Sequence, residues 1–284
     1  MSSTVSKEIV AAIDEVMAYC SIFDHHMEVE VLLRNLQIKS SKKDILVAIK
    51  SSSYLVLENG IVFSKQYPKN SDLVRSKELA TKTLEETKEV LSILNSCPQI
   101  TGLAITGSVA AGVNAEDGDV DVLIITKPGW VWRVRALAIY LSHKHPHGRL
   151  LCPNMVMSEG SLQFEKGVYS AREMMQIVPI KDNGGITELY AKNAWTEQIL
   201  PNASRKQSIA LKQTCQYPWW WKVMRVPLLG KFIESWEASR RIKELTHSSK
   251  SKEAVYSKSV CRGHENSHKS RIEAKYTHVT EAIR

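Results

Sequence analysis

The sequence has few cysteines and no long apolar run, and both absences exclude classes of protein. Five cysteines occur in 284 residues, and no two of them form a CxxC pair. This odd, scattered set argues against a disulfide framework and a structural zinc site, and it predicts a reducing cytoplasm. No stretch reaches the roughly 18 consecutive apolar residues of a membrane span. The first ten residues, MSSTVSKEIV, lack the apolar segment of a secretion signal. The chain is therefore expected to be cytoplasmic, without a membrane span.

The sequence also lacks an excess of acidic residues. Lys and Arg total 38 against 30 Asp and Glu, which gives a formal net charge of +8. Hydrophobic residues make up 43% and charged residues 24%, a balance that predicts a buried core and excludes wholesale disorder. A moderately basic surface favours polyanionic partners such as nucleotides or nucleic acid. The alternative is a basic tail on a near-neutral body, because residues 239–284 are dense in Lys, Arg and His.

The first 70 residues have the pattern of three helices followed by a hairpin. Asn59-Gly60 separates two β-rich runs between residues 54 and 63, which predicts a tight hairpin. Apolar spacing and capping residues predict helices over 6–20, 28–36 and 42–50. This order is typical of a winged-helix domain, which binds nucleic acid through its third helix. Four lysines support that interpretation: Lys39, Lys42, Lys43 and Lys50. The alternative is a module that serves only packing or dimerisation.

Beyond an expected linker at 68–71, helices and strands are mixed. A long polar helix is expected over 72–94. The predicted strands are 100–105, 119–126 and 150–157, with helices over 109–113 and 130–145 between them. After them we expect a hairpin over 161–169, a helix opened by a capping box at Ser170 and Glu173, and a helix over 186–200. Residues 204–284 are expected to be mostly helical. Their Trp219–Trp221 triplet is interpreted as helix packing, with base stacking or a membrane-interface patch as the alternatives.

Two short motifs together predict phosphate chemistry. Asp119 and Asp121 alternate along a strand, so both carboxylates point to one face and can share a hard divalent cation. Magnesium prefers one or two carboxylates, with phosphate oxygens and water as its other ligands. Gly107-Ser108 lies between a strand and a short helix, where glycine permits close approach to a phosphate and helix amides attract anions. Either motif alone is common, but the order strand, Gly-Ser, helix, Asp-x-Asp strand is far more specific.

The segment TGSVAAGVNAEDGDVDVLIIT resembles the signature of the polymerase-β nucleotidyltransferase superfamily. The resemblance is tight over 100–126 and extends in element order over about 100–200. The wider chain also resembles a group of prokaryotic nucleotidyltransferase-domain proteins. The resemblance implies that Gly107 and Ser108 contact the phosphates of a nucleoside triphosphate such as ATP, and that Asp119 and Asp121 bind Mg²⁺, with Mn²⁺ as the alternative ion. Lys127 directly follows the second strand and is a candidate for contact with the triphosphate.

The sequence departs from the superfamily pattern at Asn154. Many of these enzymes carry a third carboxylate on a later strand, and the polar candidate on the matching strand here is Asn154. An amide oxygen can ligate a metal, but it cannot serve as a general base. We therefore expect Asn154 to lie beside the aspartates, with one tightly held magnesium and a modest basal rate. Glu159, just past this strand, is a possible substitute base.

The expected fold is α+β. It comprises a winged-helix-like domain (1–70), a nucleotidyltransferase core with a small mixed sheet (71–203) and a helical C-terminal region (204–284). The expected function is transfer of a nucleoside monophosphate from a nucleoside triphosphate to a hydroxyl of RNA, protein or a small molecule. The basic charge favours nucleic acid, and the sequence does not specify an oligomeric state. One alternative is a non-catalytic regulator that binds nucleotide or nucleic acid on the same fold. Another is a toxin–antitoxin component that modifies a protein partner.

Overall fold

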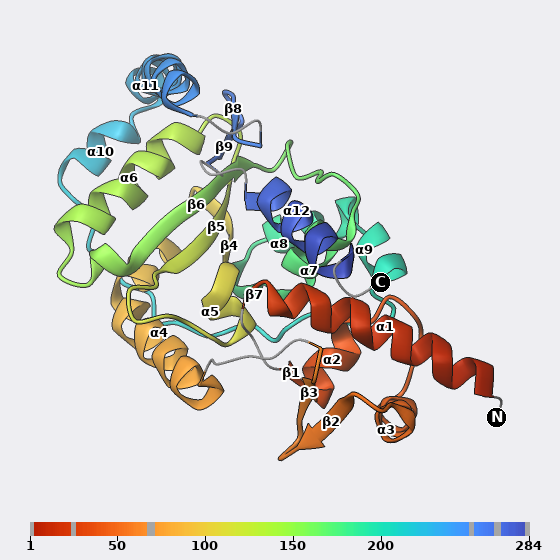
Figure 1. Ribbon diagram of the computed structural model, residues 1–284. Coiled ribbons are helices and arrows are strands. Elements are labelled where there is room, and N and C mark those ends of the chain that lie inside the picture. The colour runs from red at the N-terminus through yellow and green to blue at the C-terminus, as the bar shows by residue number, and fades with distance from the viewer. Residues whose placement is uncertain (1–2, 24–26, 67–71, 250–252, 264–267, 282–284) are drawn as a thin grey trace.

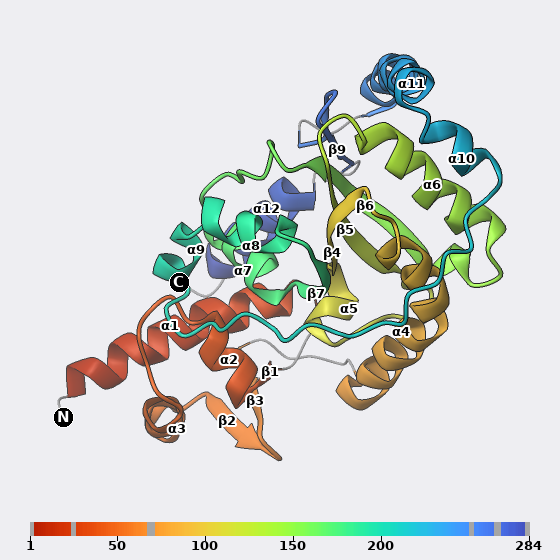
Figure 2. The same cartoon turned by 180° about the vertical axis from the view of Figure 1, so that it is seen from behind.

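The computed structural model describes residues 3–23, 27–66, 72–249, 253–263 and 268–281, and it has an α+β architecture (Figures 1 and 2). The expected linker at 68–71 lies outside the described residues. Among the described residues, no helix has both the length and the apolar content that crossing a bilayer requires.

Three helices and a small antiparallel sheet form the described part of residues 1–66. Asn59 and Gly60 have positive φ angles of 51° and 80°, as a two-residue hairpin turn requires, so the predicted hairpin is confirmed. The Ser41 hydroxyl accepts from the backbone N–H of Asp44, and the Asp44 carboxylate accepts from Ser41, which starts the third helix. In chain order the elements are α1 (Ser3–Ser21), β1 (Met27–Glu28), α2 (Val29–Asn35), α3 (Lys42–Ser51), β2 (Leu55–Glu58) and β3 (Ile61–Ser64).

The lysines near α3 are partly engaged within the protein. Lys39 Nζ donates to the backbone carbonyl of Pro201 at 2.9 Å, and Lys42 forms an ion pair with Glu30. The N-terminal end of α3 therefore lies near a segment that comes much later in the chain. Helix and strand order are those expected for a winged helix, but the winged-helix assignment and nucleic-acid binding through α3 stay predictions.

A larger mixed sheet forms the centre of the molecule, in the strand order β7-β4-β5-β6-β9-β8. β5 and β6 run parallel, and the other neighbouring pairs run antiparallel. Its strands are β4 (Ile100–Ile105), β5 (Val120–Thr126), β6 (Leu151–Ser158), β7 (Val178–Asp182), β8 (Val255–Tyr256) and β9 (Val260–Arg262). The associated helices are α4 (Leu73–Asn95), α5 (Gly107–Ala111), α6 (Val131–Lys144), a 3₁₀ turn (Gly148–Leu150), α7 (Val168–Gln176), α8 (Gly185–Lys192), α9 (Trp195–Ile199), α10 (Trp220–Met224), α11 (Pro227–Ser248) and α12 (His268–Glu281).

The two faces of the larger sheet contribute to different parts of the core. Along β5, Val122 and Ile124 pack with residues of α4 and α6, whereas Leu123 and Ile125 pack with residues of α7 and α8. Side chains alternate along a strand, so Asp121 is directed to the same side of the sheet as Leu123. The strand alternation thus places this carboxylate opposite α7.

The region after β6 differs from the sequence expectation. The predicted hairpin over 161–169 is wrong, because residues 161–166 lie outside any helix or strand and α7 begins at Val168. The predicted capping box is also wrong, since α7 begins at Val168 and both Ser170 and Glu173 lie inside it. β7, which contains Pro179, is not among the strands predicted from the sequence. Proline is tolerated there because β7 is an edge strand.

The C-terminal third is not purely helical. β9 pairs with β6 and extends the central sheet, and β8 pairs with β9. The helix expected over 186–200 is divided into α8 and α9 at Asn193, whose buried amide donates to the carbonyls of Leu162 and Leu189. The expected packing role of the Trp triplet holds for Trp221, which is buried, but not for Trp219, which is exposed.

Candidate active site

Two aspartates and a cysteine converge at the N-terminal end of β5. Asp119, Asp121 and Cys152 each offer one ligand atom, a carboxylate oxygen or the thiol sulfur, and these three atoms all lie within 4.8 Å of one another. β6 runs parallel to β5 and places Cys152 opposite Asp121 in the register. The backbone carbonyl of Asp121 accepts from the N–H of Thr106 at 2.8 Å, which joins this point to the end of β4. The cluster therefore lies where three structural elements meet.

The electrostatics of the cluster favour a bound cation. Burial, and then the negative charge of Asp119, raise the pKa of Asp121 to about 6. The Cys152 thiol donates to this carboxylate, and burial together with the two aspartates raises the pKa of the thiol. The thiol is therefore protonated at neutral pH. A divalent cation would relieve the repulsion between the two carboxylates.

The residues present fit magnesium better than a soft metal. Two carboxylates are a typical protein contribution to a Mg²⁺ site, which takes its other ligands from phosphate oxygens and water. Thiolates suit softer ions, and the Cys152 thiol is kept protonated by its surroundings. We therefore interpret Asp119 and Asp121 as the candidate metal ligands and Cys152 as a hydrogen-bond donor to Asp121.

Gly107 allows the chain to pass directly against Asp121. Its φ is +65°, and a Cβ atom at this position would lie well inside contact distance of Asp121 Oδ2. Ser108 follows, and its hydroxyl donates to the side-chain oxygen of Asn114 at 3.1 Å. The amide of Asn114 donates in turn to Thr83 of α4 at 3.1 Å. This chain of contacts fixes the Gly-Ser turn relative to α4 and β5.

A cavity of about 870 Å³ opens next to the Gly-Ser turn. Gly107, Ser108, Asp121 and Asn154 all line it, whereas Asp119 is exposed and belongs to the metal-ligand cluster at its edge. Segments far apart in the chain complete the walls, namely the end of α1, α2, α7, the loop at 200–206, the strands β8 and β9, and α12. The cavity therefore exists only where the N-terminal region, the core and the C-terminal region meet.

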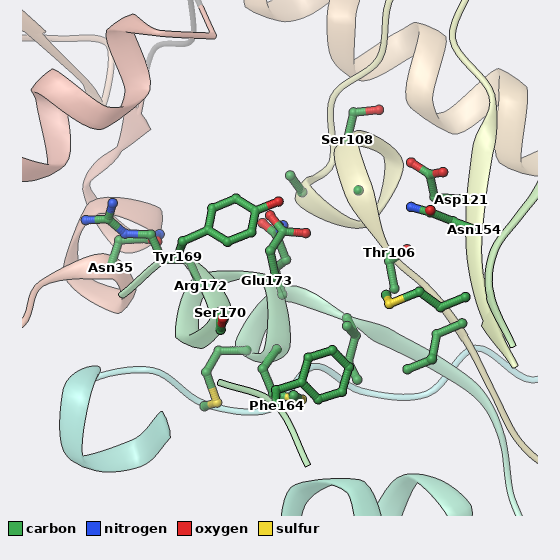
Figure 3. A pocket seen from close by; sticks show the side chains of 18 of the residues that line it. Asn35, Thr106, Ser108, Asp121, Asn154, Phe164, Tyr169, Ser170, Arg172 and Glu173 are labelled. Carbon is green, nitrogen blue, oxygen red and sulfur yellow. The ribbon is translucent and has the colours of Figure 1, made fainter. Parts of the chain in front are cut away.

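Helix α7 forms the wall opposite the aspartates. In Figure 3, Tyr169 and Glu173 project from this helix toward the space faced by Ser108 and Asp121. Burial, and then the charge of Asp121, raise the pKa of Glu173 to about 7. The Glu173 carboxylate accepts from the side chain of Gln176 at 2.9 Å. Burial and the neighbouring Glu173 also raise the pKa of Tyr169.

Cationic and unpartnered polar groups line the same cavity. Arg34 donates to the carbonyl of Ser204 at 2.6 Å, and Lys206 donates to the carbonyl of Ala110 at the end of α5. Burial, and then the nearby Arg34, lower the pKa of Lys206. Within the described residues, the buried Thr106 hydroxyl and the buried Arg172 Nε have no hydrogen-bond partner. Such groups are suited to an anionic, oxygen-rich ligand.

Most of the residues predicted from the sequence lie together. Gly107, Ser108, Asp121 and Asn154 line the cavity, and Figure 3 shows Asn154 next to Asp121. Lys127 does not join them, because it is exposed beyond the opposite end of β5, six residues and roughly 20 Å along the strand. Glu159 lies at the same distant end, where its N–H donates to the carbonyl of Thr126.

Several site residues were missed by sequence reasoning. Cys152 was overlooked because the β5–β6 register, and not its own neighbours in sequence, brings it to Asp121. The sequence pattern assigns Glu173 to a capping box. The signal that could have identified it is its spacing of four residues from Tyr169, which places both side chains on one helix face. Arg34 and Lys206 come from segments outside the motif, so no local pattern points to them.

The Gly-Ser turn and the paired aspartates lie at the N-terminal end of β5, an interior strand of the mixed sheet, and this arrangement is consistent with a nucleotidyltransferase core. The family model described as "Nucleotidyltransferase domain" matches residues 84–141, which include the turn and both aspartates. This match over part of the chain supports a relationship to the polymerase-β-type nucleotidyltransferase superfamily. Searches of curated proteins and of solved structures returned no match. The matched segment ends before Cys152, Asn154 and Glu173, so their roles rest on geometry alone.

Proposed function

We propose that this protein transfers a nucleoside monophosphate from a nucleoside triphosphate to a hydroxyl acceptor and releases pyrophosphate. The observation that carries the proposal is the convergence of Asp119 and Asp121 with the Gly107–Ser108 turn at one cavity. The family match supports a nucleotidyl-transfer reaction in general. The choice of magnesium, of nucleotide and of acceptor belongs to the proposal.

The cavity residues divide into those that bind the triphosphate and those that bind the ion. Gly107 admits a phosphate close to the backbone, and the Thr106 hydroxyl, which has no hydrogen-bond partner among the described residues, donates to its oxygens. The Ser108 hydroxyl would exchange its bond to Asn114 for a bond to phosphate. Lys206 and Arg34 line the same cavity and supply positive charge. Asp119 and Asp121 would hold the divalent cation, which would neutralise phosphate charge and orient the triphosphate for in-line attack.

Glu173 is the proposed proton acceptor. The acceptor hydroxyl oxygen forms a bond to the α-phosphorus, the bond between the α-phosphorus and the bridging oxygen breaks, and pyrophosphate leaves. The hydroxyl proton passes to the Glu173 carboxylate, which projects into the cavity from α7. A carboxyl group with a pKa of about 7 is well suited to this task near neutral pH. Glu173 would thus take the role of the third carboxylate, which the amide of Asn154 does not provide.

The test is incubation with each radiolabelled nucleoside triphosphate, total RNA and cell protein, with pyrophosphate measured in parallel. Asp121→Asn should abolish pyrophosphate release and labelling. Asp117→Asn is the matched control, because it removes an exposed carboxylate from the same loop outside the cluster. Labelling of RNA, protein or a small molecule would identify the acceptor. Tight nucleotide binding without pyrophosphate release from any triphosphate would instead show a non-catalytic regulator.

A further inference from the structure

The N-terminal half of helix α11 carries large apolar residues on the side that faces away from the protein. Leu228, Phe232 and Trp236 are spaced at i, i+4 and i+8 and are 83%, 69% and 56% exposed. The residues buried in α11 are Gly230, Glu234 and Ala238, which have the same spacing. The two rows are offset by two residues, or roughly 200° around the helix, so they lie on opposite faces. In this half of the helix the amphipathicity is therefore inverted relative to a surface helix of a globular protein, whereas Ile242 and Leu245 further along pack against the core.

In the N-terminal half of α11, polar and small groups hold the inward face against the protein. The buried Glu234 carboxylate accepts from the N–H groups of Trp132 and Arg133 at 3.0 and 2.9 Å, at the start of α6. It also pairs with the Arg133 side chain at 3.3 Å. A Cβ at Gly230 would lie within contact distance of the Arg133 guanidinium. The contacts that attach this part of α11 to the protein therefore do not involve the exposed residues Leu228, Phe232 and Trp236.

The exposed apolar surface extends from α11 onto the preceding segment. We call it the α10–α11 patch, and its members are Trp219, Val226, Leu228, Leu229, Phe232 and Trp236. Trp219 is 80% exposed at the start of α10, whereas the adjacent Trp221 is buried. In both views α11 lies at the end of the molecule opposite α1–α3 (Figures 1 and 2). A contiguous apolar surface of this kind marks a site of interaction.

The charges around the patch are positive. Residues 198–233 contain no Asp or Glu. Lys222, Arg225 and Lys231 are exposed between the apolar residues. Among the acids of α11 that follow, Glu234 is buried against Arg133 and Glu237 pairs with Arg240. The partner of this patch must therefore offer both apolar volume and negative charge.

We propose that the α10–α11 patch binds the surface of an anionic phospholipid bilayer, with the helix lying in the plane of the interface. Leu and Phe enter the acyl region, Trp residues lie at the headgroup level, and lysine and arginine contact lipid phosphates. A second copy of the chain fits less well, because a symmetric contact would bring the cations of both copies together. Nucleic acid also fits less well, because Leu228, Leu229 and Val226 cannot stack on bases.

The test is co-sedimentation of the full chain with vesicles of phosphatidylcholine, with and without phosphatidylserine. Binding is expected only to the vesicles that contain phosphatidylserine, and it should weaken as salt rises. Leu228→Ser with Phe232→Ser should weaken binding by about 10-fold or more. Lys222→Gln with Lys231→Gln should weaken it by about 30-fold at low salt, since each cation near such a surface contributes about 1 kcal/mol. Val74→Ser on α4 is the matched control, because Val74 is 66% exposed outside the patch.

Two companion measurements distinguish the other occupants. Size-exclusion chromatography would overturn the proposal if the parent chain dimerises and the Leu228→Ser, Phe232→Ser variant is monomeric. A nucleic-acid binding assay would overturn it if that variant loses affinity for RNA while the parent ignores vesicles. Failure of the parent chain to bind anionic vesicles would also overturn it. These outcomes are independent of nucleotidyl transfer, because none of these residues lines the catalytic cavity.

Discussion

Adding one methyl group at Gly107 should disable the site while leaving the protein folded. Gly107 has a φ of +65°, and the new Cβ would collide with the Asp121 carboxylate. The carboxylate is the movable end of a side chain, so it can rotate away at little cost to the fold. That rotation removes one of the two proposed metal ligands. Gly107→Ala should therefore weaken the binding of metal and nucleotide without a comparable loss of stability of the fold.

Gly112→Ala is the matched control for this experiment. Gly112 ends α5 with a φ of +86°, and a Cβ there would meet no atom within 4 Å. A non-glycine residue with φ in this range destabilises the folded state by roughly 1–2 kcal/mol. Alanine also restricts the unfolded chain more than glycine does, which offsets about 0.4–1 kcal/mol of that loss. Both variants should therefore lose about 1 kcal/mol of unfolding free energy, a shift of a few degrees in Tm.

The two variants should differ in metal and nucleotide binding. Disturbing even an outer partner of a metal ligand lowers affinity by about 10–100-fold, so displacing Asp121 itself should cost at least about 10-fold. Mn²⁺ binding by electron paramagnetic resonance and nucleotide binding by calorimetry would measure this loss. If Gly107→Ala binds both as tightly as Gly112→Ala, the close approach to Asp121 does not matter and the site assignment is wrong.

The remaining predictions concern the carboxylates. Asp121→Asn should raise the metal-free unfolding free energy at pH 7.5 by on the order of 1–3 kcal/mol. The parent carboxylate, with its pKa raised to about 6, is charged at that pH, so the gain should shrink as pH falls from above 6 toward 4 in denaturant titrations. An equal gain at both ends of this range would contradict the assignment. Glu173→Gln should lower turnover by about 10²–10⁴-fold with unchanged nucleotide Kd, and it should remove the rise in rate through pH 7. Unchanged turnover would exclude Glu173 as the base. Cys152→Asp should strengthen Mg²⁺ binding in calorimetry more than Asn154→Asp does, because Cys152 is the residue grouped with the aspartates; the reverse order would restore Asn154 as the third position. Glu234→Ala should cost about 3–5 kcal/mol by chemical denaturation, since it leaves a buried guanidinium unpaired.

Local patterns predicted the parts of the structure that depend on near neighbours. The alternation in DVDVLIIT predicted a strand, which the structure has from Val120 onward with Asp121 on it and Asp119 just before it, and the Asn59-Gly60 pair predicted the turn that the structure shows. Both features are set by backbone geometry within a few residues, so one sequence contains the necessary information.

Features that depend on distant segments were not predictable in this way. The position of Cys152 depends on the register between two parallel strands, which a crossover helix separates in sequence. β7 contains Pro179 and is acceptable only because it lies at the sheet edge. Lys206 reaches the site because the chain after α9 returns past α5. In each case tertiary packing, not local preference, decides the outcome.

The composite cavity has a consequence for how this protein would acquire substrate preference. Its metal side belongs to the core, whereas α1, α2 and the C-terminal strands supply other walls. Substitutions in these outer segments, Arg34 excepted, would change the shape of the cavity without replacing a residue proposed to bind the metal or the triphosphate. The Arg172 guanidinium lies over the Tyr19 ring at 4.1 Å and links α7 to α1. A displacement of α1 would therefore disturb a contact of α7, the helix that carries Glu173.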